Sequence, residues 1–190
     1  LCLVEPFVAI WLGQAFVLTK AILILAVAIY YFKGINSGID IAKNAAGLYY
    51  PDRFIPMAEA IANMVISIVL AKRYGIAGVL FGTLVSFLAL SFWAKPYFVC
   101  RDVFEVSFAR YAVREGREIV VSVLVAAGTW YAVSLVSLEN VLLSFGVKAL
   151  LALALSNGLL LLVYFKTSEF QYLRGLLESA ANRIGKRKKA

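Results

Sequence analysis

The chain has 190 residues, of which 63% are apolar and only 16% are charged, and its mean hydropathy is +0.86. Soluble domains carry about 25% charged residues, and a small soluble fold leaves too much surface in water to hide this much apolar area. The composition therefore excludes an ordinary soluble domain. The net charge is +8, but the basic residues lie in short polar stretches between apolar runs. That pattern is typical of cytoplasmic loops of membrane proteins, and it argues against nucleic-acid binding.

Five apolar segments have the length of about 20 residues that a helix needs to cross a bilayer. In chain order, they are Ala15–Phe32, Phe54–Ala71, Gly75–Ala94, Ile119–Leu138 and Val141–Phe165. The third and fourth contain no charged residue, whereas the first carries Lys20 and the fifth carries Lys148. The sequence predicts an all-α integral membrane protein with five transmembrane helices.

The basic residues predict the orientation of these helices. Of the 19 lysines and arginines, 15 fall in the connections 33–53 and 95–118 and in the segment from Lys166 onward. The opposite side holds only Lys72 and Arg73. By the positive-inside rule, the C-terminus is expected in the cytoplasm, and with five crossings residue 1 begins on the outer face.

Three parts of the chain are expected from this topology. Residues 1–14 are predicted to be the outer-face end of a preceding, truncated helix and its loop, so that a longer natural protein is expected. Residues 15–165 form the five-helix bundle. Residues 166–190 are predicted to form a cytoplasmic amphipathic helix and a basic tail, because apolar residues recur there every three or four positions and Lys-Arg-Lys-Lys follows. Anionic membrane lipids are the expected partners of that tail.

A series of short motifs between residues 7 and 111 resembles a known family of transporters. The motifs are Trp11-Leu12-Gly13 with Phe16, Ala46-Gly47-Leu48-Tyr49-Tyr50, Asp52-Arg53, Glu59-Ala60 with Asn63 and Ser67, Tyr74-Gly75-Ile76-Ala77-Gly78-Val79, Gly82-Thr83, Trp93, Pro96 and Phe104. Their order and spacing are similar to those of the Wzx-type lipid-linked oligosaccharide flippases of the multidrug/oligosaccharidyl-lipid/polysaccharide superfamily. The last two predicted spans agree with that family only in hydropathy and number.

The resemblance implies a fold and a mechanism. It implies that the chain is the C-terminal portion of a MATE-like protein with two six-helix bundles, and that the partner bundle lies in the missing N-terminal half. It implies transport of an undecaprenyl-pyrophosphate-linked oligosaccharide across the bacterial or archaeal cytoplasmic membrane by alternating access, for O-antigen, capsule or exopolysaccharide. No metal or organic cofactor is expected. A proton or a sodium ion could couple to transport.

Three polar residues lie on one face of the second predicted span. Glu59, Asn63 and Ser67 are four residues apart, and polar groups inside a membrane usually face a cavity or a partner. One interpretation is a polar wall of the substrate cavity, with Glu59 as proton acceptor or headgroup contact. The other is that Glu59 reaches interfacial water while Asn63 and Ser67 bond to a neighbouring helix, which we favour for these two.

Two basic residues are candidate phosphate contacts. Lys148 shares a face of the fifth span with Ser144 and Ser156, so a cavity-lining role is favoured over snorkelling to the interface. Arg53 is expected to anchor a helix end among lipid headgroups, or else to grip phosphate in the cavity mouth. Gly78, Gly82 and Ser86 repeat a small residue every four positions and predict a close-packing face.

Other functions remain as alternatives. Another exporter of the same superfamily, for drugs or a peptidoglycan precursor, fits most of the same features. A membrane enzyme acting on polyprenyl-linked sugars fits less well, since the chain has no histidine and one acidic residue within a predicted span. The sequence therefore predicts that the protein is a transporter and not an enzyme.

Overall fold

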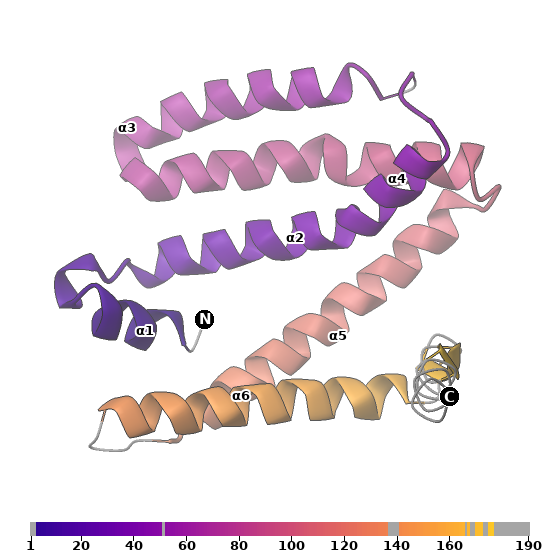
Figure 1. Ribbon diagram of the computed structural model, residues 1–190. Helices are drawn as coiled ribbons and strands as arrows, with labels where there is room; N and C mark the ends of the chain where they lie inside the picture. The colour runs from indigo at the N-terminus through magenta and orange to yellow at the C-terminus, as the bar shows by residue number, and fades with distance from the viewer. Residues whose placement is uncertain are drawn as a thin grey trace, which may run out of the picture. The chain divides into compact units, whose positions relative to one another are not determined.

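The structure, a computed structural model, describes residues 3–50, 52–136, 141–165, 167, 170–172 and 175–176. Every regular element in these ranges is a helix (Figure 1). Four stretches are long and apolar enough to cross a membrane, namely Lys20–Ala45, Ile55–Asp102, Phe108–Ser134 and Leu143–Tyr164. This property indicates an all-helical membrane protein. The chain divides into two compact units near residue 120, and each is described by itself.

The first unit begins with two short helices and a long one. Helix α1 spans Val4–Trp11, the 3-10 helix η1 spans Gln14–Phe16, and α2 spans Lys20–Ala45. Gly47, with φ +68°, follows the cap residue of helix α2. The amide of Gly47 donates a hydrogen bond to Asn44 O, and the amide of Leu48 donates one to Lys43 O. These two bonds form a Schellman motif, which satisfies the last carbonyls and requires a residue that tolerates positive φ.

Helix α3, Ile55–Ala89, is folded back on itself at Gly75. Gly75 has φ +56° and ψ −135°, a backbone conformation open in practice only to glycine. We call residues 55–74 the first arm and residues 76–89 the second arm. In Figure 1, the two arms run side by side from a tight turn.

Contacts between the two arms pair residues at increasing distance from the turn. A Cβ atom at Gly78 would lie 2.6 Å from the carbonyl carbon of Leu70, and one at Gly82 would lie 2.5 Å from Ser67 Oγ. Thr83 Oγ1 donates a hydrogen bond of 3.2 Å to Asn63 Oδ1. The backbones therefore approach so closely that only glycine fits at positions 78 and 82, which confirms the predicted close-packing face.

Helix α4, Ser91–Asp102, continues from the second arm after a bend at Leu90. It lies alongside α2 in parallel: Lys33 Nζ is 6.0 Å from the Phe87 ring centroid just before the bend, Asn36 reaches Ser91, and Asp40 pairs with Lys95. Helices α2, α3 and α4 all contact one another. Together they form an up-down-up bundle, in which the first arm runs opposite to the other two.

This bundle has an apolar outside and several polar groups inside. Tyr30 on α2 and Ile68 on α3 are 83% and 55% exposed, whereas Asn36, Ser86 and Ser91 are at most 1% exposed. A water-soluble bundle has the opposite distribution, because burying apolar area is its main driving force. In lipid, close packing and hydrogen bonds between helices take over that role, so the distribution supports a membrane environment.

Two further helices complete the described chain. Helix α5 spans Phe108–Ser134 and crosses the division between the units, and α6 spans Val141–Tyr164. Most of the predicted amphipathic tail, including residues 177–190, lies outside the described residues.

Several predicted boundaries are wrong. The first apolar segment was expected to begin as a helix at Ala15, but α2 begins at Lys20. The supposed connections are largely helical, since α2 continues to Ala45, α4 runs to Asp102 and α5 starts at Phe108. Hydropathy detects only the apolar part of a helix, whereas the backbone stays helical through polar turns whose side chains pair with neighbours. The expectation of five crossings stays a prediction, because Ile55–Asp102 forms one continuous stretch that contains the reversal.

Replacing Gly75 by alanine tests the reversal. No atom of the described residues lies within 4 Å of a Cβ atom built at this position, so the effect should come from backbone conformation alone. A residue held in such a sparsely populated region costs about 1–3 kcal/mol. We expect a lower thermal midpoint in detergent, measured by circular dichroism. Gly34→Ala on α2 is the matched control, because its Cβ would also meet open space and its φ is ordinary. Equal midpoints for the two variants would contradict the assigned turn.

Candidate functional site

The predicted site residue Glu59 lies within the three-helix bundle. Ser91 Oγ of α4 donates a hydrogen bond to Glu59 Oε2 on the first arm of α3. Asn36 Nδ2 of α2 donates a 3.4 Å bond to the backbone carbonyl of the same Ser91. One residue from each helix thus meets at a single polar junction, which we call the Glu59 cluster: Asn36, Glu59 and Ser91.

The Glu59 cluster retains unused hydrogen-bonding capacity. Asn36 is 1% exposed, and its Oδ1 atom has no hydrogen-bond partner within the described part of the chain. A buried polar atom without a partner is costly in free energy, so such atoms often mark a place where water, an ion or a ligand binds. The cluster therefore combines an ionisable carboxylate with a free acceptor, which a purely structural junction does not require.

Asn63 and Ser67 lie deeper in the hairpin, on the side of Glu59 nearer to Gly75. Asn63 Oδ1 accepts hydrogen bonds from Ser67 Oγ at 2.9 Å and from Thr83 Oγ1 at 3.2 Å. Ser67 Oγ also lies 3.3 Å from the carbonyl of Val79. These three side chains join the two arms to each other, so their geometry serves helix–helix hydrogen bonding. A direct contact of either residue with substrate stays a prediction.

Two ion pairs continue the polar interior beyond the Glu59 cluster. Lys95 Nζ of α4 lies 3.0 Å from Asp40 Oδ1 of α2, one helical turn from Ser91 and Asn36. Lys43 Nζ lies 2.6 Å from Asp52 Oδ2, and these side chains are only 14% and 5% exposed. The second pair ties the end of α2 to the loop that precedes α3. Interhelical polar contacts thus extend from the hairpin to this loop.

The predicted residue Arg53 lies on that same loop. Its Cζ atom is 4.3 Å from the Tyr50 ring centroid and 4.6 Å from that of Phe54. These distances allow cation–π contact, which holds the guanidinium against aromatic rings without neutralising it. Among the described residues, no carboxylate lies within ion-pair distance of Arg53. Arg53 therefore lies with the aromatic rings of this loop and is not part of the Glu59 cluster.

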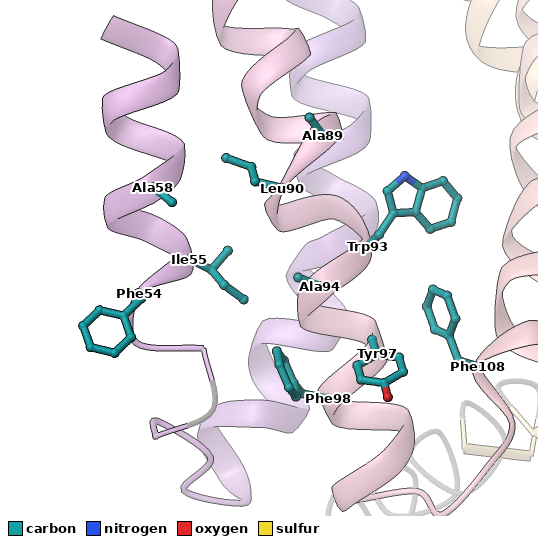
Figure 2. A pocket seen from close by; sticks show the side chains of 10 residues that line it. All are labelled: Phe54, Ile55, Ala58, Ala89, Leu90, Trp93, Ala94, Tyr97, Phe98 and Phe108. Atoms are coloured by element: carbon teal, nitrogen blue, oxygen red, sulfur yellow. The ribbon is translucent and has the colours of Figure 1, made fainter. Parts of the chain in front are cut away.

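An open, apolar groove lies between the first arm of α3 and α4 (Figure 2). Its volume is about 540 Å³, and Phe108 at the start of α5 adds to its wall. The groove is open because residues with small side chains, such as Ala58 and Ala94, line it. Trp93 and Tyr97 also border it. The spacing of residues along the chain does not predict this groove.

Lys148 lies in the second unit, half-buried on α6. Ser156 on the same helix donates its hydroxyl to the backbone carbonyl of Ala152 at 2.6 Å. This bond is the usual way for a serine to satisfy its hydroxyl inside a membrane helix. A role for Lys148 in contacting phosphate stays a prediction.

Two residues of the Glu59 cluster were missed in the sequence. Asn36 was placed in a connection and Ser91 was not singled out. A signal was present: Asn36 and Asp40 are four residues apart, and so are Ser91 and Lys95. Had both helices been extended through these polar turns, the two pairs would have suggested polar faces that meet.

Within the described residues, no group of three or more acidic or cysteine side chains could hold a metal ion. The fold and the polar interior define the class, an all-helical membrane protein with an ionisable group among its helices. No protein-family model, curated protein or solved structure matches the chain.

Proposed function

We propose that this chain is the C-terminal, five-span part of a flippase that moves undecaprenyl-pyrophosphate-linked oligosaccharides across the cytoplasmic membrane. The observation that carries the proposal is the Glu59 cluster, in which a carboxylate lies among apolar helices beside an amide oxygen that has no partner among the described residues. Ionisable groups are costly inside a membrane and mark transport pathways or ion sites there. The ordered motifs that resemble Wzx-type proteins supply the substrate class.

The proposal requires a topology with five crossings. The reversal at Gly75 divides Ile55–Asp102 into two antiparallel parts, the first arm and the second arm with α4. In this proposal, each part crosses the membrane once. The turn carries Lys72 and Arg73, while the opposite end of the three-helix bundle carries Lys43, Arg53 and Lys95. Under the positive-inside rule, the turn faces outward and the tail lies in the cytoplasm.

The chemistry of flipping needs no covalent step. Sugars and pyrophosphate cannot cross hydrocarbon unaided, because their polar groups lose water without gaining partners. A polar path between two bundles gives them partners, and rocking of one bundle against the other exposes the path to each side in turn. In this scheme, the Glu59 carboxylate takes up the coupling proton. The Asn36 amide oxygen then accepts a hydrogen bond either from the protonated carboxyl group of Glu59 or from the substrate. The predicted substrate contact of Lys148 belongs to the second unit and stays a separate prediction.

Glu59→Gln tests this function. Glutamine keeps the shape of the side chain and its bond with Ser91, but it cannot ionise. If Glu59 links proton uptake to substrate movement, the transport rate should fall to a small fraction of the wild-type rate. The measurement is the amount of surface polysaccharide in the producing cell, together with lipid-linked oligosaccharide retained in the inner leaflet.

The matched control is Glu105→Gln, which removes a charge from an exposed residue between α4 and α5. It should leave polysaccharide output unchanged. Normal output from Glu59→Gln, at normal protein level in the membrane, would remove Glu59 from the transport path. Loss of drug resistance with normal polysaccharide would instead favour the alternative exporter of the same superfamily.

A further inference from the structure

We propose that the groove between α3 and α4 is a binding site for an anionic phospholipid, with one acyl chain in the groove and the phosphate at Arg53 and Arg101. The site is independent of the flippase function. It rests on the juxtaposition of an apolar slot with two arginines at one of its ends.

The slot has the chemistry and size for a hydrocarbon chain. Its volume of about 540 Å³ lies within the range of roughly 300–1,000 Å³ that is typical of ligand pockets. The lining is almost entirely carbon, with Ala58, Ala89 and Ala94 providing depth and Leu90 and Trp93 providing walls. Trp93 is 43% exposed, so the slot opens at the surface of the bundle. Hydrocarbon is the surrounding solvent for a membrane helix pair, and a chain would enter from the side.

The aromatic rings at one end of the slot mark its mouth. Figure 2 shows Phe54, Tyr97 and Phe98 gathered at this end, and Ala58, Ala89 and Leu90 farther along. Arg53 Cζ lies 4.6 Å from the Phe54 ring centroid. Arg101 Cζ lies 5.4 Å from the Phe98 centroid and 5.8 Å from the Tyr97 centroid. Both guanidinium groups are therefore packed against rings that line the groove.

The charge at the mouth selects the headgroup. Arg53 has no carboxylate partner in the described ranges, whereas Arg101 uses Nε and Nη2 to bind Asp102, at 2.5 and 3.0 Å. A guanidinium has five N–H donors in a fork that matches phosphate oxygens, so Arg101 keeps free donors and Arg53 keeps all of them. The excess positive charge favours a headgroup with a net negative charge over a zwitterionic one.

The layout also distinguishes a lipid from a protein partner. A lipid places a phosphate at one end of a long apolar chain, and the groove places two cations at one end of a long apolar slot. An amphipathic helix would instead present charges along its whole length. The match between these two layouts is the reason for committing to a phospholipid as the occupant.

The test is lipid binding to the full chain in detergent micelles, measured by native mass spectrometry with phosphatidylglycerol and with phosphatidylcholine of the same acyl chains. The wild type should bind phosphatidylglycerol more tightly. Arg53→Gln with Arg101→Gln should weaken the first phosphatidylglycerol site by roughly thirtyfold, since each arginine near a phosphate contributes a factor of about five. Ala58→Trp, which fills the slot, should weaken binding of both lipids.

The matched control is Lys72→Gln with Arg73→Gln, which removes two exposed cations at the Gly75 turn. It should leave the affinity unchanged. Circular dichroism with thermal melting identifies variants that fail to fold. In that case the single substitution Arg53→Gln replaces the double variant and Ala58→Leu replaces Ala58→Trp, with the same direction of effect expected.

Three results would overturn the site. Equal affinity for both lipids in the wild type would exclude headgroup selection. Unchanged binding in folded Ala58→Trp would exclude the slot. Conversion of a dimer to a monomer by Ala58→Trp, without loss of lipid, would assign the groove to a second copy of the chain.

Discussion

Gly78→Leu is expected to disrupt the helical hairpin of α3. A Cβ atom at this position would lie 2.6 Å from the carbonyl carbon of Leu70 and 3.0 Å from the amide nitrogen of Ala71. These are backbone atoms of the opposite arm and cannot move aside as a flexible side chain would, so the two arms must separate. Overpacking costs about 1–3 kcal/mol in ordinary cores, and a clash with backbone belongs at the upper end of that range. The thermal midpoint in detergent, followed by circular dichroism, measures the loss.

A second glycine-to-leucine substitution separates the effect of the position from the effect of the larger side chain. Gly38→Leu adds the same side chain to a helix where a Cβ meets nothing within 4 Å, and it should melt close to the wild type. The thermal midpoint of Gly78→Ala should lie between the midpoints of the two leucine variants. If Gly78→Leu and Gly38→Leu melt together, the close approach of the two arms is wrong.

Lys43→Met is expected to have the second large effect. Its ammonium group lies 2.6 Å from the carboxylate of Asp52, and the Asp52 side chain is only 5% exposed. Removing one partner of a buried pair leaves an uncompensated charge, which costs about 3–5 kcal/mol. The loop that leads into α3 should lose its attachment to α2, and the thermal midpoint should drop.

The protein contains a matched comparison for this pair. Lys95→Met breaks the pair with Asp40, whose side chain is 37% exposed, and such a pair is worth about 0–1 kcal/mol. Lys43→Met combined with Asp52→Asn should recover much of the loss, since no charge is then left unpaired. Equal losses for Lys43→Met and Lys95→Met, without recovery in the double variant, would show that burial does not govern these pairs.

Both experiments examine the connections that hold the bundle around Glu59. The hairpin positions Glu59 opposite Ser91, and the Lys43–Asp52 pair fixes the start of the arm that carries Glu59. A variant that loosens either connection should also impair transport if the proposed function is right. Folding variants must therefore be judged on stability first, and Glu59→Gln remains the direct test of function.

Part of the site could be predicted from residue spacing. Glu59, Asn63 and Ser67 recur every four residues, so they had to share a helix face, and Asn63 and Ser67 are joined by a 2.9 Å hydrogen bond. Gly78 and Gly82 follow the same rule and form the close contact between arms. Spacing within one helix is a local property, fixed by 3.6 residues per turn.

The partners of these residues could not be predicted in this way. Nothing near Glu59 in the sequence indicates that its carboxylate meets Ser91, which lies 32 residues away, or that Asn36 joins them from another helix. The aromatic groove combines the start of α3 with α4 and Phe108. Each of these contacts depends on which helices pack together and in which register.

The sequence by itself determined that the chain is apolar enough for a membrane, where its apolar segments lie, and which polar residues share a helix face. These properties depend on composition and on local helical geometry, and both can be read along the chain. Only the tertiary structure decided that the polar faces of α2, α3 and α4 meet at Glu59, that Lys43 and Asp52 form a buried pair, and that a groove opens beside them. The physical reason is that a helix face limits the direction of a side chain, whereas its partner is selected by packing between segments distant in sequence.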